Sequence, residues 1–127
     1  ERESGKRAFL NYGHTLAHAL ETVGKHQLAH GEAVAIGLIF AARLARALGR
    51  IDDARVDYHE LVVGQTYSLQ TRMPSGLDIN ELLAAMARDK KALNGLTFIL
   101  DSSNGLEIVS DISADVVRSE LVNFSQA

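Results

Sequence analysis

The sequence has 127 residues, of which 46% are hydrophobic and 23% charged, and its formal net charge is −3. That length allows one ordinary hydrophobic core and is too short for two, so we expect a single domain over residues 1–127. The small net charge excludes a basic surface for nucleic acid and a polyacidic tail. Without cysteine there are no disulfides or thiolate sites, which fits a cytoplasmic protein, and any metal needs His, Asp or Glu.

The longest apolar run, from Ala33 to Ala42, is well below the ~20 residues that a membrane span needs. We therefore interpret it as part of a buried helix. The chain opens Glu1-Arg2-Glu3-Ser4, without an initiator Met or an apolar signal region. For that reason we expect it to be a piece of a longer polypeptide.

The first half of the chain predicts two helices. Residues 7–23 place apolar side chains on one side of a helix, and Gly24 suits its C-cap. After a short connector, residues 31–48 are apolar almost all round, and Gly49 ends this run. That pattern is typical of a helix at the centre of a bundle.

The next predicted helices are recognised by their first residues. Asp52 can cap an amphipathic helix that ends near Val63, and residues 65–76, with the only proline, are predicted as a loop. Asp78, followed three residues later by a glutamate, resembles the start of a capping box for a helix over residues 79–88.

The last segment predicts a hairpin and a final helix. Residues 96–100 and 106–109 have β-like composition and flank the turn-forming residues 101–105. Ser113 can cap a last helix that extends to Phe124. The predicted fold class is therefore mainly α, with five helices and one small β-hairpin.

A polar stripe follows the first predicted helix. Arg7, Asn11, His14 and His18 are spaced by four, three and four residues, so on a continuous helix they fall within an arc of about 60°. A solvated helix face would explain four polar residues. A solvated helix face usually carries Lys and Glu, however. His and Asn are poorer helix formers, and their side chains can bind metals or anions.

His30 stands at the start of the apolar helix, and a short connector brings it near the first helix. His14 and His30 could therefore bind a common metal, although a lone His at a helix start is often a capping or surface residue. Imidazole suits Zn²⁺, and a catalytic zinc usually has about three protein ligands and one open position. The sequence offers only two convincing ligands.

Several catalytic motifs are absent. The segment His14-Thr15-Leu16-Ala17-His18 has the histidine spacing of a zinc-protease helix, but Thr15 stands in place of the glutamate base, which argues against a metalloprotease. Neither a phosphate-binding loop nor a dinucleotide fingerprint occurs anywhere in the sequence. If the protein uses a nucleotide, another segment must bind it.

The remaining charged residues allow two interpretations. Lys90 and Lys91, after Asp89, are either cations favourably placed at a helix C-terminus or contacts to an anion. Lys25, His26 and His59 have no other candidate residues around them in the sequence, and we treat all three as surface residues.

Two stretches, Arg7–Glu21 and His30–Leu38, closely resemble the two signature stretches of the 3-dehydroquinate synthase family, and Asp89-Lys90-Lys91 resembles its later motif. The resemblance is dense from Arg7 to about Leu48 and loose beyond it. Ala17 stands where many members have glycine.

The resemblance implies a zinc site in which Zn²⁺, or Co²⁺, is bound by His14 and His30. A third ligand, a glutamate, and the NAD-binding domain would lie upstream of Glu1, and the intact enzyme would be a homodimer. The other motif residues would bind substrate: Asn11 and His18 its phosphate, Arg7 its carboxylate or another polar group, and Lys90 or Lys91 the phosphate.

The implied reaction converts 3-deoxy-D-arabino-heptulosonate 7-phosphate to 3-dehydroquinate and phosphate in the shikimate pathway. A sister sugar phosphate cyclase acting on a sedoheptulose or glucose phosphate would share the fold and the histidines. A helical metal-binding module without catalysis is the third alternative, and there Glu32 or His18 would complete the site.

Overall fold

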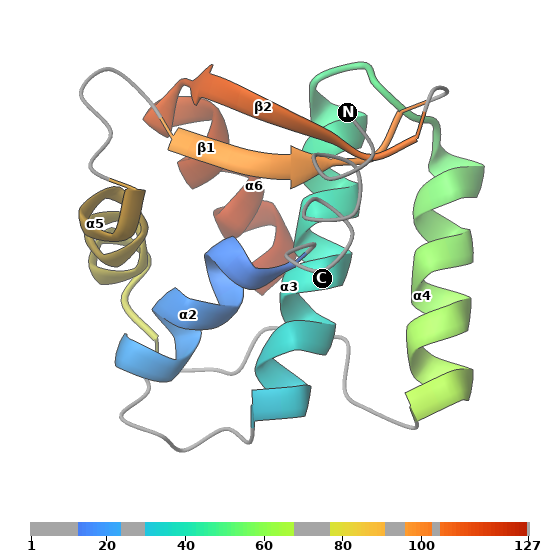
Figure 1. The fold of residues 1–127 in the computed structure, drawn as a ribbon, viewed down its shortest axis with the longest axis horizontal. Helices are drawn as coiled ribbons and strands as arrows, with labels where there is room; N and C mark the ends of the chain where they lie inside the picture. Colours follow the sequence, from blue (N-terminus) through green and yellow to red (C-terminus); the bar gives the residue numbers. More distant parts are fainter. Residues whose placement is uncertain (1–12, 24–29, 68–76, 91–95, 103–104, 127) are drawn as a thin grey trace.

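The computed structural model describes residues 13–23, 30–67, 77–90, 96–102 and 105–126. These residues form five helices and one antiparallel hairpin (Figure 1). In chain order the elements are α2 (His14–Val23), α3 (His30–Ala47), α4 (Asp53–Tyr67), α5 (Ile79–Lys90), β1 (Leu96–Leu100), β2 (Glu107–Ile112) and α6 (Ala114–Ser125). The predicted mainly α fold with a small hairpin is confirmed.

The helix α3 runs through the middle of the fold and packs against α2, α4, α6 and β1 (Figure 1). Ten of its side chains or glycine positions are buried, from Ala33 to Ala45. The ring of Phe40 lies 5.8 Å from that of Phe98 and 6.1 Å from that of Phe124, measured between centroids. The predicted buried central helix is confirmed, because several elements each cover part of its apolar surface.

The helix α2 begins at His14, and this corrects the predicted continuous helix over residues 7–23. Gly13 has a φ of 84°, which a right-handed helix cannot contain. The polar stripe from Arg7 to His18 is therefore not carried by one unbroken helix. Arg7 and Asn11 themselves lie outside the described residues, as do Gly24 and the connector.

The two glycines Gly13 and Gly37 allow α2 to approach α3 closely. A β carbon on Gly37 would overlap the carbonyl oxygen of Gly13 and lie 3.3 Å from the backbone nitrogen of Ala17. A β carbon on Gly13 would lie 2.9 Å from Leu38. Only glycine fits at these positions, so the backbones of the two helices are nearly in contact where the histidine side chains begin.

The predicted caps are confirmed at three helices. The Asp52 carboxylate accepts a hydrogen bond from the Arg55 backbone N–H at 3.0 Å, and that of Asp78 accepts one from the Asn80 N–H at 2.8 Å. The Ser113 hydroxyl accepts from the Asp115 N–H at 3.2 Å. Each side chain satisfies a backbone donor that the first turn of a helix leaves without a partner.

Two predicted helix ends were too early. The helix α4 continues to Tyr67, so the loop predicted from Gln65 is wrong for its first three residues, and residues 68–76 lie outside the described part. The helix α5 continues to Lys90 and therefore includes Asp89, which was predicted to follow it.

The hairpin pairs Leu100 with Glu107 and Phe98 with Val109, but Leu96 with Ile112. The second strand thus contains one extra residue between the last two pairs, a β-bulge, and Asp111 in this stretch has a φ of 60°. Both strands were predicted, and β2 runs from one residue later than predicted to Ile112.

A buried ion pair joins α3 to α6. The Nε of Arg43 donates to Glu120 Oε2 at 2.9 Å, and the two side chains are 13% and 8% exposed. The guanidinium carbon of Arg43 also lies 5.1 Å from the centroid of the Phe124 ring. None of the helices within the described residues has the length and apolar character to cross a membrane.

Candidate functional site

Three histidines gather where α2 crosses α3. The ring centroid of His14 lies 5.8 Å from that of His18, one turn later on α2, and 5.9 Å from that of His30, the first residue of α3. His14 is partly buried, whereas His18 and His30 are exposed. The close backbone approach at Gly13 and Gly37 holds the two helices at a separation at which these imidazoles meet.

The Nδ1 atom of His14 is buried and has no hydrogen-bond partner among the described residues. A buried imidazole nitrogen without a partner is destabilising by about 1–3 kcal/mol. A metal ion, or a polar group supplied from outside these residues, would satisfy it. This nitrogen is therefore the observation that makes the cluster fit a bound metal.

His30 is fixed by a carboxylate from the other helix. Its Nδ1 lies 3.2 Å from both Oε1 and Oε2 of Glu21, near the end of α2. An ionised carboxylate only accepts hydrogen bonds, so the Nδ1 of His30 must be the donor. The resemblance did not single out Glu21, although its position seven residues after His14 places both on one face of a helix.

The described residues supply only part of a complete metal site. Among them, no group of three or more His, Asp or Glu side chains is arranged to bind a metal ion. Two neutral imidazoles are suitable donors for zinc or cobalt, but a catalytic zinc usually needs about one further protein ligand. The geometry therefore fits a metal that is also bound by a group outside the described part of the chain.

The other predicted site residues are not brought to this cluster by described contacts. Arg7, Asn11 and Lys91 lie outside the described residues. Lys90 is the last residue of α5, a helix that packs against α2, but the placement of its side chain is not described.

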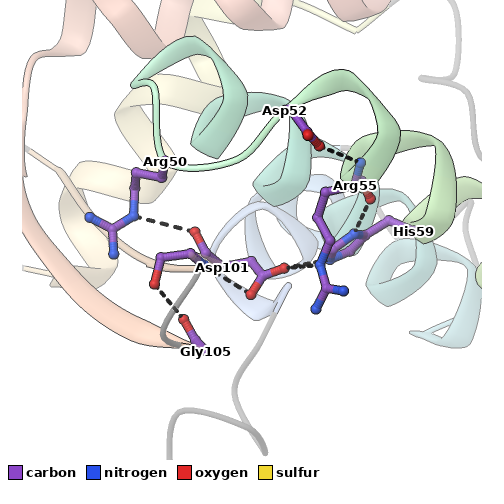
Figure 2. A network of polar contacts seen from close by, with 7 residues as sticks. Arg50, Asp52, Arg55, His59, Asp101 and Gly105 are labelled. Carbon is purple, nitrogen blue, oxygen red and sulfur yellow. Dashed lines mark hydrogen bonds and ion pairs between the residues drawn. The ribbon is translucent and has the colours of Figure 1, made fainter.

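A second polar cluster lies at the hairpin turn (Figure 2). The Asp101 carboxylate is 3% exposed and accepts from Arg55 Nε at 2.6 Å and from the Ser102 N–H at 2.9 Å. Arg50 donates to the Asp101 carbonyl and pairs with Glu107. Beside it is an open hollow of about 720 Å³.

His59 belongs to this second cluster, so its prediction as an isolated surface residue is wrong. Its Nδ1 lies 2.8 Å from the Arg55 carbonyl, its Nε2 lies 3.9 Å from Asp101, and its side chain is only 12% exposed. The contact between His59 and Asp101 joins residues 42 positions apart, so local sequence pattern could not reveal it. Because its arginines and carboxylates pair with one another, we interpret the cluster as a structural connection between α4 and the hairpin.

The sequence matches a known family over most of its length. The family model for the C-terminal part of 3-dehydroquinate synthase covers residues 1–92. A putative aminodehydroquinate synthase from Amycolatopsis mediterranei is 52% identical over 121 residues, which are 95% of this chain and 34% of that protein. A 3-dehydroquinate synthase from Synechococcus is 43% identical over 113 residues, which are 87% of this chain and 30% of that protein.

Solved structures share the fold at lower identity. A 2-deoxy-scyllo-inosose synthase complexed with carbaglucose-6-phosphate, NAD⁺ and Co²⁺ superposes with a TM-score of 0.79 at 22% identity, over 97% of this chain and 35% of that one. A 2-epi-5-epi-valiolone synthase from Streptomyces hygroscopicus with NAD⁺ and Zn²⁺ bound gives 0.71 at 18% identity, over 91% and 32%.

The chain thus spans about a third of the length of the curated relatives that it matches. The sequence match and the structural match cover the same part of the chain. The family model includes α2 and α3, and the superposition extends over nearly the whole chain. The chain belongs to the 3-dehydroquinate synthase family and corresponds to its C-terminal domain.

Proposed function

We propose that this chain is the metal- and substrate-binding domain of an enzyme that converts 3-deoxy-D-arabino-heptulosonate 7-phosphate to 3-dehydroquinate and phosphate. The reaction would serve aromatic amino acid biosynthesis by the shikimate pathway in the cytoplasm. The observation that carries the proposal is the approach of His14 to His30, 5.9 Å between ring centroids, in a chain of this family.

In this proposal His14 and His30 bind Zn²⁺ or Co²⁺, together with a glutamate from another part of the enzyme. Support comes from the buried Nδ1 of His14, which has no hydrogen-bond partner among the described residues, and from relatives of the fold that contain NAD⁺ with Co²⁺ or Zn²⁺. When bound, such a metal acts as a Lewis acid on a substrate hydroxyl or carbonyl. NAD⁺ would bind to an N-terminal domain.

The remaining motif residues would hold the substrate. His18 lies one turn beyond His14 and is exposed, so its imidazole is accessible to donate a hydrogen bond to a phosphate oxygen. Asn11, with Lys90 or Lys91, would bind the same phosphate, and Arg7 the carboxylate. These groups contribute by positioning the substrate and by stabilising its negative charge.

A second substrate is favoured by one comparison. The relative at 52% identity is named a putative aminodehydroquinate synthase, whereas the 3-dehydroquinate synthase from Synechococcus is 43% identical. An amino-substituted analogue of the same sugar acid phosphate is therefore the alternative substrate. The zinc histidines and the phosphate contacts would serve both.

The metal assignment can be tested on the complete enzyme by replacing each histidine with alanine. His14→Ala and His30→Ala should lose zinc and all phosphate release, because each leaves the metal one protein ligand short. His18→Ala should keep its zinc and lose rate. Stoichiometric zinc in both ligand variants would refute the proposed site.

The substrate assignment needs a panel of sugar phosphates. Turnover by the wild-type enzyme, with NAD⁺ and zinc, is measured for four substrates: the heptulosonate phosphate, its amino-substituted analogue, a sedoheptulose phosphate and glucose 6-phosphate. The proposal expects the highest kcat/KM for the first. A preference for the amino analogue would select the alternative, and turnover of neither acid would contradict both.

A further inference from the structure

We infer that Glu21 is a positioning residue that fixes the tautomer and the orientation of His30, so that His30 binds its metal through Nε2. The inference rests on the proposed function, because it assumes that His30 is a metal ligand. It concerns a residue to which the proposed function gives no role, and it specifies which nitrogen of His30 faces the metal.

The contact between the two side chains is double. Both carboxylate oxygens of Glu21 lie 3.2 Å from the Nδ1 of His30, and the two residues stand on different helices. With the proton held on Nδ1, a neutral imidazole has its lone pair on Nε2. The carboxylate therefore selects the nitrogen that is available to a metal.

The position of Glu21 on α2 is also consistent with this role. His18 and Glu21 stand four and seven residues after His14, and residues at these intervals share one face of a helix with about 3.6 residues per turn. One face of α2 thus carries a partly buried imidazole, an exposed imidazole and the carboxylate that holds the histidine of the neighbouring helix.

The different exposures of the two side chains show which of them needs support. The side chain of His30 is 62% exposed, whereas that of Glu21 is 25% exposed. An exposed imidazole at the first residue of a helix has little packing to limit its rotation. The less exposed carboxylate, on a helix that crosses α3 closely, supplies that restraint.

Glu21 could instead bind the metal itself. The described geometry opposes this, because Glu21, His14 and His30 do not form a three-ligand group. A ligand role and a positioning role also predict different behaviour of glutamine. An amide oxygen still accepts from Nδ1 of His30, but an amide is a poor substitute for a carboxylate ligand of zinc.

The experiment measures zinc affinity in the complete enzyme by competition with a chromophoric chelator. Glu21→Ala should weaken zinc binding by about 10–100-fold, the usual effect of removing such a partner. Glu21→Gln should restore most of the affinity. Thr22→Ala, an exposed neighbour on α2, is the control and should bind zinc like the wild type.

A second measurement reads the tautomer directly. Nitrogen-15 NMR of histidine-labelled, metal-free enzyme, with His30 assigned by its absence from His30→Ala, should show the proton of His30 on Nδ1 in the wild type and in Glu21→Gln. In Glu21→Ala the proton should be redistributed toward Nε2. If the contact between Glu21 and His30 were only a structural ion pair at the surface, its loss in Glu21→Ala would change neither the tautomer of His30 nor the zinc affinity.

The outcomes separate this inference from the proposed function. If His30→Ala keeps stoichiometric zinc, the metal assignment itself fails. If His30→Ala loses zinc while Glu21→Ala binds it with wild-type affinity, only the role of Glu21 is overturned. If Glu21→Gln loses zinc as completely as His30→Ala, Glu21 is a ligand and the positioning role is refuted.

Discussion

Gly37 of α3 lies against Gly13, which precedes α2, with no room for a side chain between them. A β carbon added to Gly37 would overlap the Gly13 carbonyl oxygen and lie 3.0 Å from its carbonyl carbon. Both neighbours are backbone atoms, which cannot rotate away as a flexible side chain could. The distance between α2 and α3, and with it the distance between His14 and His30, depends on this pair of glycines.

Gly37→Ala should therefore force α2 away from α3 and disturb the histidine cluster. We expect a loss of about 1–3 kcal/mol in the free energy of unfolding, the usual penalty for an overpacked core. In the complete enzyme, zinc affinity should fall as well. Urea denaturation and chelator competition measure the two effects.

The matched control is Gly64→Ala in α4, where a β carbon would meet nothing within 4 Å. That change should stabilise the protein by up to about 1 kcal/mol, because alanine is the better helix former. If Gly37→Ala is as stable as Gly64→Ala, the two helices do not approach as closely as described.

Asp101→Asn should destabilise the connection between α4 and the hairpin. The Asp101 carboxylate is almost fully buried and accepts from both Arg55 and Ser102. Removing its charge leaves the guanidinium with a weaker acceptor, so we expect a loss of about 1.5–3 kcal/mol. The control is Asp53→Asn, whose side chain is 85% exposed in its pair with Arg46. Equal denaturation midpoints for the two variants would contradict this prediction.

Arg43 and Glu120 should show strong coupling in a double-mutant cycle. Breaking a buried pair by removing one partner costs about 3–5 kcal/mol, because the other charge stays buried without a partner. Arg43→Met together with Glu120→Leu should be much less destabilising than the sum of the single changes. The exposed pair of Arg118 and Asp115 is the comparison, with an expected coupling of about 0.2–1 kcal/mol. Additive single changes at Arg43 and Glu120 would refute the coupling.

Residues 1–127 by themselves should fold but neither turn over substrate nor bind zinc tightly. The chain should fold because the described core residues all lie within it. Zinc should bind weakly because the two imidazoles are fewer than the roughly three protein ligands that a catalytic zinc usually has. Calorimetry with zinc, and a phosphate-release assay with NAD⁺ and substrate, test this expectation. Submicromolar zinc affinity that survives Glu32→Gln would show that no ligand from elsewhere is needed.

Local chemistry made several elements predictable. A helix cap depends on one side chain and the backbone within three residues of it, so Asp52, Asp78 and Ser113 each marked a helix start correctly. The central position of α3 also followed from composition alone, because a helix that is apolar all round must be covered on every side.

Features that depend on backbone conformation or distant contacts were not predictable in the same way. Side-chain periodicity continues through Gly13, but the positive φ of that residue does not fit a right-handed helix, so α2 begins only at His14. His59 lies 3.9 Å from Asp101, a contact between α4 and the hairpin turn that no local pattern in the sequence reveals. At the histidine cluster, the identities of His14 and His30 came from the motif, whereas the contact of Glu21 with His30 required the crossing of two helices.

The helix α4 lies at one edge of the described fold and packs against α3 (Figure 1). Of its described side chains, Val56 and Val63 alone are buried, so little apolar surface opposes its detachment. Its amide protons should therefore exchange with solvent by local opening, while those of α3 exchange only when the whole domain unfolds. Because His14, Glu21 and His30 stand on α2 and α3, such openings would leave the histidine cluster intact.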